Sequence, residues 1–369
     1  KKDSKVKLGI KRSNSKKILT YDVIRGDIPV NSIDAHYMLS DNVGYVKVGK
    51  FARNTYQEFV EALIELQSQG ASKFVVDLRD NAGGFMDQAI LMANEFLPTD
   101  RMIVYTKGRS LNNETVAVSD GNGFFQNNEI VVLTNEFSAS ASEIFAGAIQ
   151  DNDRGLVVGR RSFGKGLVQN QTVLSDSSAV RLTVARYYTP SGRSIQKEYK
   201  RGKNGKYQQD IVDRYAHGEF YNIDSIKLDK SKIFHTVGGR EVYGGGGIMP
   251  DIFVPEDTTS VTSYFVSVVN AGLIQKFAFD VTDHYREMLD GVETAEQLLK
   301  IIPRDNTLLS NFVSFAAQNG VPARWYYIRQ SQDILLRQIK AMIVRDALGY
   351  NEFYRIYFGD DKTINRALE

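Results

Sequence analysis

The sequence predicts an α/β protein with a β-rich N-terminal segment and a helical C-terminal domain. Two patterns carry this prediction. From about residue 41, short apolar strands alternate with amphipathic helices, as in a sheet covered by helices. Beyond Asp257, helical periodicity replaces the alternation. We therefore expect three regions: residues 1–40, a core over 41–256 and a helical domain over 257–369.

Composition narrows the class of protein. The chain has 369 residues, of which 42% are hydrophobic and 24% charged, as in an ordinary soluble globular protein. A net charge of +2 does not favour nucleic acid as a partner. No apolar run approaches the length of a membrane span, and the first residues are not expected to form a signal peptide, because they lead into no apolar core. The absence of cysteine excludes disulfides, zinc thiolate sites and cysteine nucleophiles.

The N-terminal region is predicted to be β structure. Val6, Leu8 and Ile10 alternate with charged residues, which is the period of a strand, and a turn at residues 13–15 precedes a second strand over 18–23. We interpret this pair as the last strands of a larger β domain.

The core begins with a strand at residues 44–48. Thr55 to Glu58 fits a capping box, so we expect a helix that starts there and ends at Gly70. Further elements follow by periodicity: a buried strand at 74–78, a helix at 86–97, strands at 102–105 and 129–133, a helix from Ser140 to about Gln150, and strands at 156–158, 166–173 and 179–185.

The last two stretches differ in character. Residues 189–250 are expected to be loop-rich, because they hold no sustained periodicity. The C-terminal domain is expected to contain helices over 263–274, 294–301, 308–318 and 325–348.

Ser140 and Lys165 form the most informative pair of residues. A serine hydroxyl is a weak nucleophile and needs a neighbouring base. A lysine can act as that base if its amine is kept neutral, which burial among apolar groups promotes. Phe163 precedes Lys165, and Leu167 and Val168 follow it, so the sequence offers such surroundings. The small residues around Ser140 also fit an ordinary helix start, which is the structural alternative.

An oxyanion formed beside Ser140 needs hydrogen-bond donors. Ser140 is expected where a helix begins, so the amide of Ala141 would be free to donate. The Gly83-Gly84 pair follows a buried strand, and glycine lets a backbone amide approach a substrate closely. A tight turn that needs positive φ explains the same two glycines.

These segments also allow other interpretations. Residues 159–166 are one residue short of a Walker A phosphate loop, but Gly166 stands where Ser or Thr should bind Mg²⁺, and a strand is expected next. In that strand Lys165 and Gln169 would share a face, so we expect Gln169 to orient the amine. A buried glutamine with a purely structural partner is the alternative. The four histidines lie in no triad motif, and no metal-ligand motif is present. Asp151 is expected to pair with Arg154 or another cation.

Five motifs in this order resemble those of the carboxy-terminal processing peptidases, or tail-specific proteases, which are Ser/Lys serine peptidases. They are residues 77–84, 138–151, 163–169, 187–196 and 246–251. The resemblance implies a crotonase/Clp-protease-like ββα core, with residues 1–40 as the end of a PDZ-like domain and a linker. It implies Ser140 as nucleophile, Lys165 as general base, Gln169 as its positioning partner, and the amides of Gly83 and Ala141 as oxyanion donors.

The implied function is a serine endopeptidase that cleaves unfolded or C-terminal segments of polypeptides through an acyl-enzyme. The alternative is a catalytically silent peptide-binding or scaffold protein of the same fold. The expected partners are polypeptide substrates, with no cofactor, no metal and no nucleic acid. The resemblance also implies a periplasmic or cell-envelope location, membrane anchoring outside this chain, and homo-oligomers built through the C-terminal helices.

Overall fold

A computed structural model describes the chain except for residues 13–14, 29, 110–113 and 200–203 and the side chains of residues 204–206 and 208. The chain divides into two compact units. The larger consists of residues 31–256 and 361–369, and the smaller of residues 1–30 and 257–360. Along the sequence, the helical part of the smaller unit therefore falls between the two segments of the larger one.

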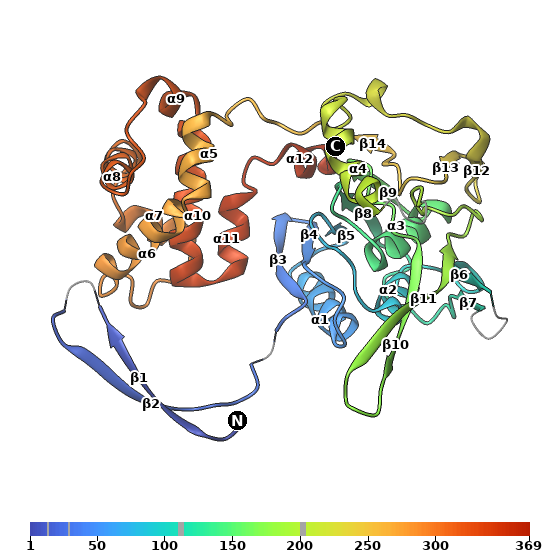
Figure 1. Cartoon of the computed structure of the whole chain (residues 1–369), viewed down its shortest axis with the longest axis horizontal. Coiled ribbons are helices and arrows are strands. Elements are labelled where there is room, and N and C mark those ends of the chain that lie inside the picture. The colour runs from blue at the N-terminus through green and yellow to red at the C-terminus, as the bar shows by residue number, and fades with distance from the viewer. Residues whose placement is uncertain (13–14, 29, 110–113, 200–203) are drawn as a thin grey trace. The chain divides into compact units, whose positions relative to one another are not determined.

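The described strands of the larger unit include a sheet in the order β14-β9-β8-β5-β4-β3 (Figure 1). Its strands run parallel from β4 to β14, and β3 pairs antiparallel with β4 at one edge. The bounds are β3 Ile33–Ser40, β4 Val43–Val48, β5 Lys73–Asp77, β8 Glu129–Thr134, β9 Leu156–Gly159 and β14 Ile252–Phe253. Because β5 and β8 are central and parallel, their carboxyl ends lie side by side at one edge of the sheet.

Three helices pack with this sheet around one core: α1 Thr55–Ser68, α2 Met86–Asn94 and α3 Ala141–Asp151. Aromatic rings join them. The Phe96 ring lies 6.2 Å from that of Phe59 and 6.4 Å from that of Phe145, measured between centroids. All eleven residues of α3 are buried, so the helix that follows Ser140 is a fixed internal element.

A second sheet of described strands has the order β10-β11-β6-β7, so β10 is an edge strand. The bounds are β6 Met102–Gly108, β7 Thr115–Val118, β10 Leu167–Val173 and β11 Ala179–Tyr188. The pairing of β10 with β11 shifts register between Val168 and Gln169. A short pair, β12 Ile233–His235 and β13 Glu241–Tyr243, lies further along the chain.

Residues 189–250, which we expected to be loop-rich, contain a helix, α4 Asn204–Ala216. Two short 3-10 turns, η2 Ile223–Ser225 and η3 Lys230–Lys232, follow it. The prediction of irregular structure was therefore wrong for α4. Arg214, in its last turn, is buried against Glu219 at 2.8 Å, so an ion pair just beyond the helix compensates for a polar sequence.

The smaller unit holds a β-hairpin and a helical array. The two strands expected from the sequence are present as β1 Lys5–Lys11 and β2 Ile18–Ile24, and they pair antiparallel as a hairpin. Arg12, beside the hairpin, is 3.2 Å from Asp283 in the helical array. The helices are α5 Ser263–Asn270, α6 Leu273–Tyr285, α7 Ala295–Ile301, α8 Asp305–Gln318, α9 Trp325–Gln330, α10 Gln332–Leu348 and α11 Tyr350–Tyr357. They enclose a separate apolar core.

Several expected boundaries need correction. β3 belongs to the core sheet, so the core begins at residue 31 and not at residue 41. The last helix, α12 Lys362–Leu368, packs against β8 and β9 of the larger unit, so the helical domain ends at residue 360. The helix expected over 263–274 is interrupted, since Gly272 adopts φ +64° between α5 and α6.

The capping box expected at Thr55 is also absent. Asn54 is the N-cap of α1, and the Glu58 carboxylate accepts hydrogen bonds from the amides of Ser32 and Ile33 at the start of β3. The Glu58 carboxylate therefore binds a distant segment of the chain and not the N-terminus of its own helix.

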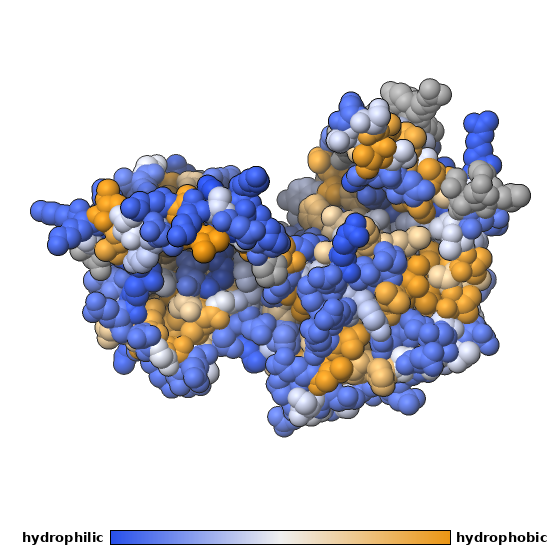
Figure 2. Space-filling model, turned by 90° about the horizontal axis from the view of Figure 1, so that it is seen from below, coloured by the Kyte–Doolittle hydropathy of each residue, from blue (hydrophilic) through white to orange (hydrophobic). Residues whose placement is uncertain are grey.

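The surface in Figure 2 is mostly hydrophilic, with apolar residues gathered in separate patches. Within the described part of the chain, no helix combines the length and the apolar character needed to cross a bilayer.

Candidate active site

Ser140 occupies a strained turn between β8 and α3. Its backbone has φ +59° and ψ −113°, a conformation that residues other than glycine rarely adopt. Such strain is held only where the surroundings determine it, and it concentrates at functional sites. The turn places Ser140 at the N-terminus of a buried helix, where free backbone amides favour negative charge. Among the described residues, no hydrogen-bond acceptor faces the Ala141 amide.

The Glu143 carboxylate ties this turn to the loop that carries Lys165. It accepts hydrogen bonds from the amides of Ser140 at 2.8 Å, Gly164 at 2.7 Å and Lys165 at 2.9 Å, and from the Ser162 hydroxyl at 2.5 Å. Burial raises the pKa of Glu143, and these four donors oppose the rise by stabilising the charged form. One fully buried carboxylate thus fixes the backbone of both segments.

Tyr187 of β11 joins the same two segments from another side. Its hydroxyl lies 3.0 Å from the Ser140 carbonyl oxygen and 2.6 Å from that of Lys165. Burial raises the pKa of the phenol well above its usual value, so it remains a donor. The sequence placed Tyr187 within a motif but assigned it no role.

The Gly83-Gly84 turn lies directly against the Ser140 turn. Gly83 adopts φ +94°, and a Cβ atom there would lie 2.5 Å from the Ala139 carbonyl oxygen and 2.8 Å from the Ala141 nitrogen. Only glycine fits such an approach. The Gly83 amide donates to the Asn81 side chain at 2.8 Å, whereas the Gly84 amide has no acceptor among the described residues.

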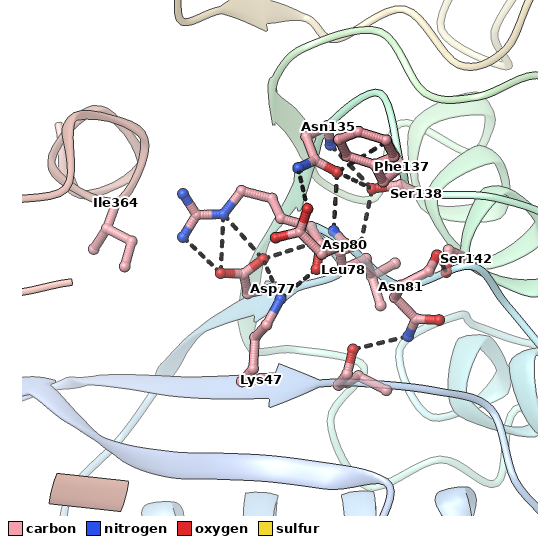
Figure 3. A network of polar contacts seen from close by, with 12 residues as sticks. Lys47, Asp77, Leu78, Asp80, Asn81, Asn135, Phe137, Ser138, Ser142 and Ile364 are labelled. Atoms are coloured by element: carbon pink, nitrogen blue, oxygen red, sulfur yellow. Dashed lines mark hydrogen bonds and ion pairs between the residues drawn. The ribbon is translucent and has the colours of Figure 1, made fainter. Parts of the chain in front are cut away.

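The loop before these glycines is held by polar contacts (Figure 3). The Ser138 hydroxyl donates to the Leu78 carbonyl at 2.8 Å. The Asn81 carbonyl accepts from the Ala139 amide and from the Ser142 hydroxyl, both at 2.9 Å, and its side-chain amide donates to Val48 at 2.8 Å. These hydrogen bonds therefore join the segments that follow β5 and β8.

A buried charge network around Asp77 lies beside this loop (Figure 3). Asp77 accepts hydrogen bonds from Tyr45 at 2.7 Å and from the Arg79 guanidinium at 2.7 Å, with Lys47 at 3.4 Å. Burial raises the pKa of Asp77, but Arg79 and Lys47 outweigh it and hold that pKa well below its ordinary range. Arg79 also donates to both Asp361 oxygens, at 2.8 and 3.0 Å.

One cleft of about 660 Å³ brings the predicted site residues together. Ser140, Lys165, Gln169 and the Gly83-Gly84 turn all line it. Lys165 is half-buried and Gln169 is exposed. Ala141 follows Ser140 and presents its amide beside Gly83.

The phosphate-loop alternative does not fit the structure. The residues after Lys165 form strand β10, not the helix that a Walker A loop requires. In the described part of the chain, none of the four histidines lines the cleft. Nor do three or more His, Asp or Glu side chains of that part form a group able to hold a metal ion. For Asp151, which was expected to pair with Arg154 or another cation, the partner is the second kind: Arg193 binds it at 2.7 Å.

Comparisons with known proteins agree with the predicted resemblance. Residues 42–205 match peptidase family S41, and residues 264–349 match a family of unknown function, DUF8443. A probable CtpA-like serine protease of Staphylococcus haemolyticus is 34% identical over 243 residues, covering 66% of this chain and 46% of the relative. A carboxy-terminal-processing protease of Bartonella bacilliformis is 35% identical over 257 residues, covering 68% and 56%.

Among solved structures, a photosystem II D1 C-terminal processing protease aligns with a TM-score of 0.43 and 26% identity. The alignment covers 70% of this chain and 57% of that chain. The chain spans about half the length of the curated relatives described above.

Proposed function

The chain belongs to peptidase family S41 through residues 42–205, and from this premise we propose that it is a serine endopeptidase that cleaves unfolded or C-terminal segments of polypeptides. The observation that carries the proposal is the cleft in which Ser140, in a strained turn at a helix N-terminus, faces the same space as Lys165. Neither residue needs a histidine or a metal ion for this chemistry.

In the proposed reaction, an extended polypeptide places its scissile carbonyl carbon at the Ser140 hydroxyl. The neutral amine of Lys165 takes the hydroxyl proton, and the Ser140 oxygen attacks the carbon. The protonated lysine then gives its proton to the leaving amine, which breaks the C–N bond and leaves an acyl-enzyme. Water, deprotonated by the same amine, attacks the ester carbon, and the Ser140 oxygen leaves and takes its proton back from the lysine. Gln169, from the same wall of the cleft, orients the lysine.

The tetrahedral intermediate carries a negative oxygen that needs donors. The amide of Ala141 is the first, and the Gly83-Gly84 turn supplies the second. The sequence favours the Gly83 amide. Because its amide already donates to Asn81, we now favour the Gly84 amide in the resting geometry. Each such donor is worth roughly 3–4 kcal/mol of transition-state stabilisation.

The finer parts of the assignment rest on the resemblance. We propose that β1 and β2 are the last strands of a PDZ-like domain, that the core is crotonase-like, and that the protein works in the periplasm or cell envelope. Homo-oligomers through the C-terminal helices and anchoring outside this chain belong to the same proposal.

The test is proteolysis of casein by the full chain. The wild type should cleave it, and Ser140→Ala and Lys165→Ala should each abolish cleavage, because the two residues act as a unit. Binding of casein without cleavage by all three proteins would favour the silent peptide-binding alternative. Cleavage that survives Lys165→Ala would remove Lys165 as the base.

A further inference from the structure

A second pocket adjoins the Ser140 cleft. It has a volume of about 830 Å³ and shares Lys165, Leu167 and Gln169 with the cleft. Since both hollows use the start of edge strand β10 as a wall, a polypeptide lying along β10 would contact both. Side chains of this pocket are therefore placed to select among substrates.

The charges along these two hollows have one sign. Besides Lys165, the cleft is lined by Arg53 and Arg181, and the pocket by Lys107, Arg109 and Arg186. Among the described lining residues there is no Asp or Glu. The chain as a whole is nearly balanced, with 46 Lys and Arg against 44 Asp and Glu. The cationic lining is thus a local feature and does not follow from composition.

Three of these cations are oriented by neutral groups. The Arg181 guanidinium donates to the Gln171 side chain at 2.9 Å, across the β10–β11 pair. The Arg53 guanidinium lies 5.4 Å from the centroid of the Phe85 ring. Lys107 lies 5.4 Å from the Tyr105 ring. Because an amide and two rings do not neutralise a cation, these contacts position the charges without compensating them.

The pocket also has an aromatic wall. Phe163 and Tyr199 each contact the Tyr207 ring edge to face, with centroids 6.1 and 5.9 Å apart. The amine of Lys197 lies 3.7 Å from the Phe163 centroid, but Asp210 pairs with it at 3.1 Å. Its charge is therefore compensated within the fold, and the wall presents an apolar surface to a ligand.

We propose that this peptidase selects acidic polypeptide segments that carry a large apolar side chain near the scissile bond. The apolar side chain would enter the aromatic pocket, and carboxylates on either side would face the five cations. Arg181 and Arg186 are the specificity-determining residues, since they flank the shared wall from β11. The proposal rests on the function proposed above and adds its substrate class.

Charge complementarity between a protein and its ligand affects specificity and association rate more than total affinity. The five cations are exposed, so each contact with a substrate carboxylate should change affinity by about two- to fourfold. Several such contacts together should give roughly tenfold, and salt should weaken the preference because exposed charges are screened over about 8–10 Å.

The first experiment measures binding, so that it does not need turnover. Three fluorescent peptides would share length and a central Phe, with flanking residues all Glu, all Gln or all Lys. The full chain with Ser140→Ala should bind the Glu peptide roughly tenfold more tightly than the Gln peptide and least tightly the Lys peptide. Equal affinity for the three, or a preference for the Lys peptide, would overturn the proposal.

The second experiment assigns the preference to residues. Arg181→Gln and Arg186→Gln, in the Ser140→Ala chain, should each reduce the Glu-to-Gln ratio by about two- to fourfold. Arg329→Gln is the matched control, because Arg329 is exposed on α9 in the other unit. A loss of the ratio in the control as large as in the two variants would contradict the assignment.

Two further probes separate the contribution of the central apolar side chain to binding from that of the carboxylates. Replacing the central Phe of the Glu peptide by Ser should weaken binding, and no change would remove the aromatic pocket from the proposal. The contrary result is a single-stranded DNA oligonucleotide that binds as tightly as the Glu peptide and loses affinity equally in Arg181→Gln. That result would show a surface that binds polyanions in general, and it would contradict selection of acidic polypeptides. Cleavage of the same peptides by Ser140-containing chain tests the proteolytic function separately.

Discussion

The Tyr187 hydroxyl lies within hydrogen-bond distance of two backbone carbonyls at once, those of Ser140 and Lys165, at 3.0 and 2.6 Å. A phenol has one hydrogen, so the two carbonyls share it. One buried side chain of β11 therefore holds the backbone of both the proposed nucleophile and the proposed base. The Glu143 carboxylate does the same through their amides.

Tyr187→Phe removes the shared donor while keeping the ring. Two carbonyls then lose a partner, which should lower kcat by roughly tenfold and stability by about 1–3 kcal/mol. KM should change little, because the ring still lines the cleft. Tyr188→Phe is the control, since Tyr188 stacks on Tyr105 at 5.0 Å. Steady-state kinetics of the two variants measure the effect. An equal fall of kcat in both would show that Tyr187 has no positioning role.

The backbone strain at Ser140 gives a stability prediction that is independent of catalysis. Glycine adopts positive φ without a steric penalty, so Ser140→Gly should be more stable than Ser140→Ala by about 1 kcal/mol, the strain relieved less the entropy that glycine costs. At Ser142, inside α3, the order should reverse, with glycine less stable than alanine by about 1 kcal/mol. Urea unfolding of the four variants checks both orders.

The sequence predicts the elements that carry this site and the residues at their ends. Local patterns located β5, β8, α3 and β10, and the spacing of motifs brought Ser140, Lys165 and the Gly83-Gly84 turn into one proposed site. Those patterns report the period of side chains along one segment. They are therefore sufficient for elements and for residues that lie at element ends.

Contacts across the chain were not predictable in this way. Glu143 looks like an ordinary first-turn carboxylate of α3, and only the fold shows that it also accepts from Gly164 and Lys165. Glu58 shows the converse, because its local capping box is displaced by β3. A single sequence carries no signal for which distant donor a buried carboxylate will find.

Glu143→Gln tests the carboxylate clamp. The amide keeps the shape but turns one acceptor into a donor that faces N–H groups, so kcat should fall by about a hundredfold and stability by about 1–3 kcal/mol. Glu95→Gln is a matched change, because Glu95 is a buried carboxylate that accepts from Tyr56 and Phe124. It should lower stability and leave kcat unchanged. Unaltered kcat in Glu143→Gln would refute the clamp.

Asp77 should make the fold sensitive to acid. Its pKa in the folded state lies well below the unfolded value of about 3.9, so its charge stabilises the fold above pH 4. As the pH falls below 4, unfolded chains take up the proton first and this contribution is lost. Asp77→Asn leaves Arg79 and Lys47 short of a partner and should cost about 3–5 kcal/mol near neutrality.

The measurement is urea unfolding of wild type and Asp77→Asn from pH 7 to pH 2. The difference in unfolding free energy should be constant above about pH 5 and should shrink below pH 4. A difference that stays constant to pH 2 would show that the Asp77 pKa is not depressed in the folded state.

Asp361 connects the start of α12 to the loop of Arg79. Its oxygens accept two hydrogen bonds from Arg79 and also cap the helix through the amides of Thr363 and Ile364, both at 2.9 Å. Asparagine caps a helix as well as aspartate does, so Asp361→Asn removes the charge and keeps the cap. We expect a loss of about 1–3 kcal/mol in Asp361→Asn and a further loss of about 1 kcal/mol in Asp361→Ala.

Hydrogen exchange of the full chain localises the effect. In Asp361→Asn the amides of α12 and of residues 79–83 should both exchange faster, because Arg79 loses one of its two carboxylate partners. Thr294→Ala, which removes the N-cap of α7 in the other unit, should affect that helix alone. Faster exchange in α12 with residues 79–83 unchanged would mean that Arg79 holds the loop through Asp77 without help from the C-terminal helix.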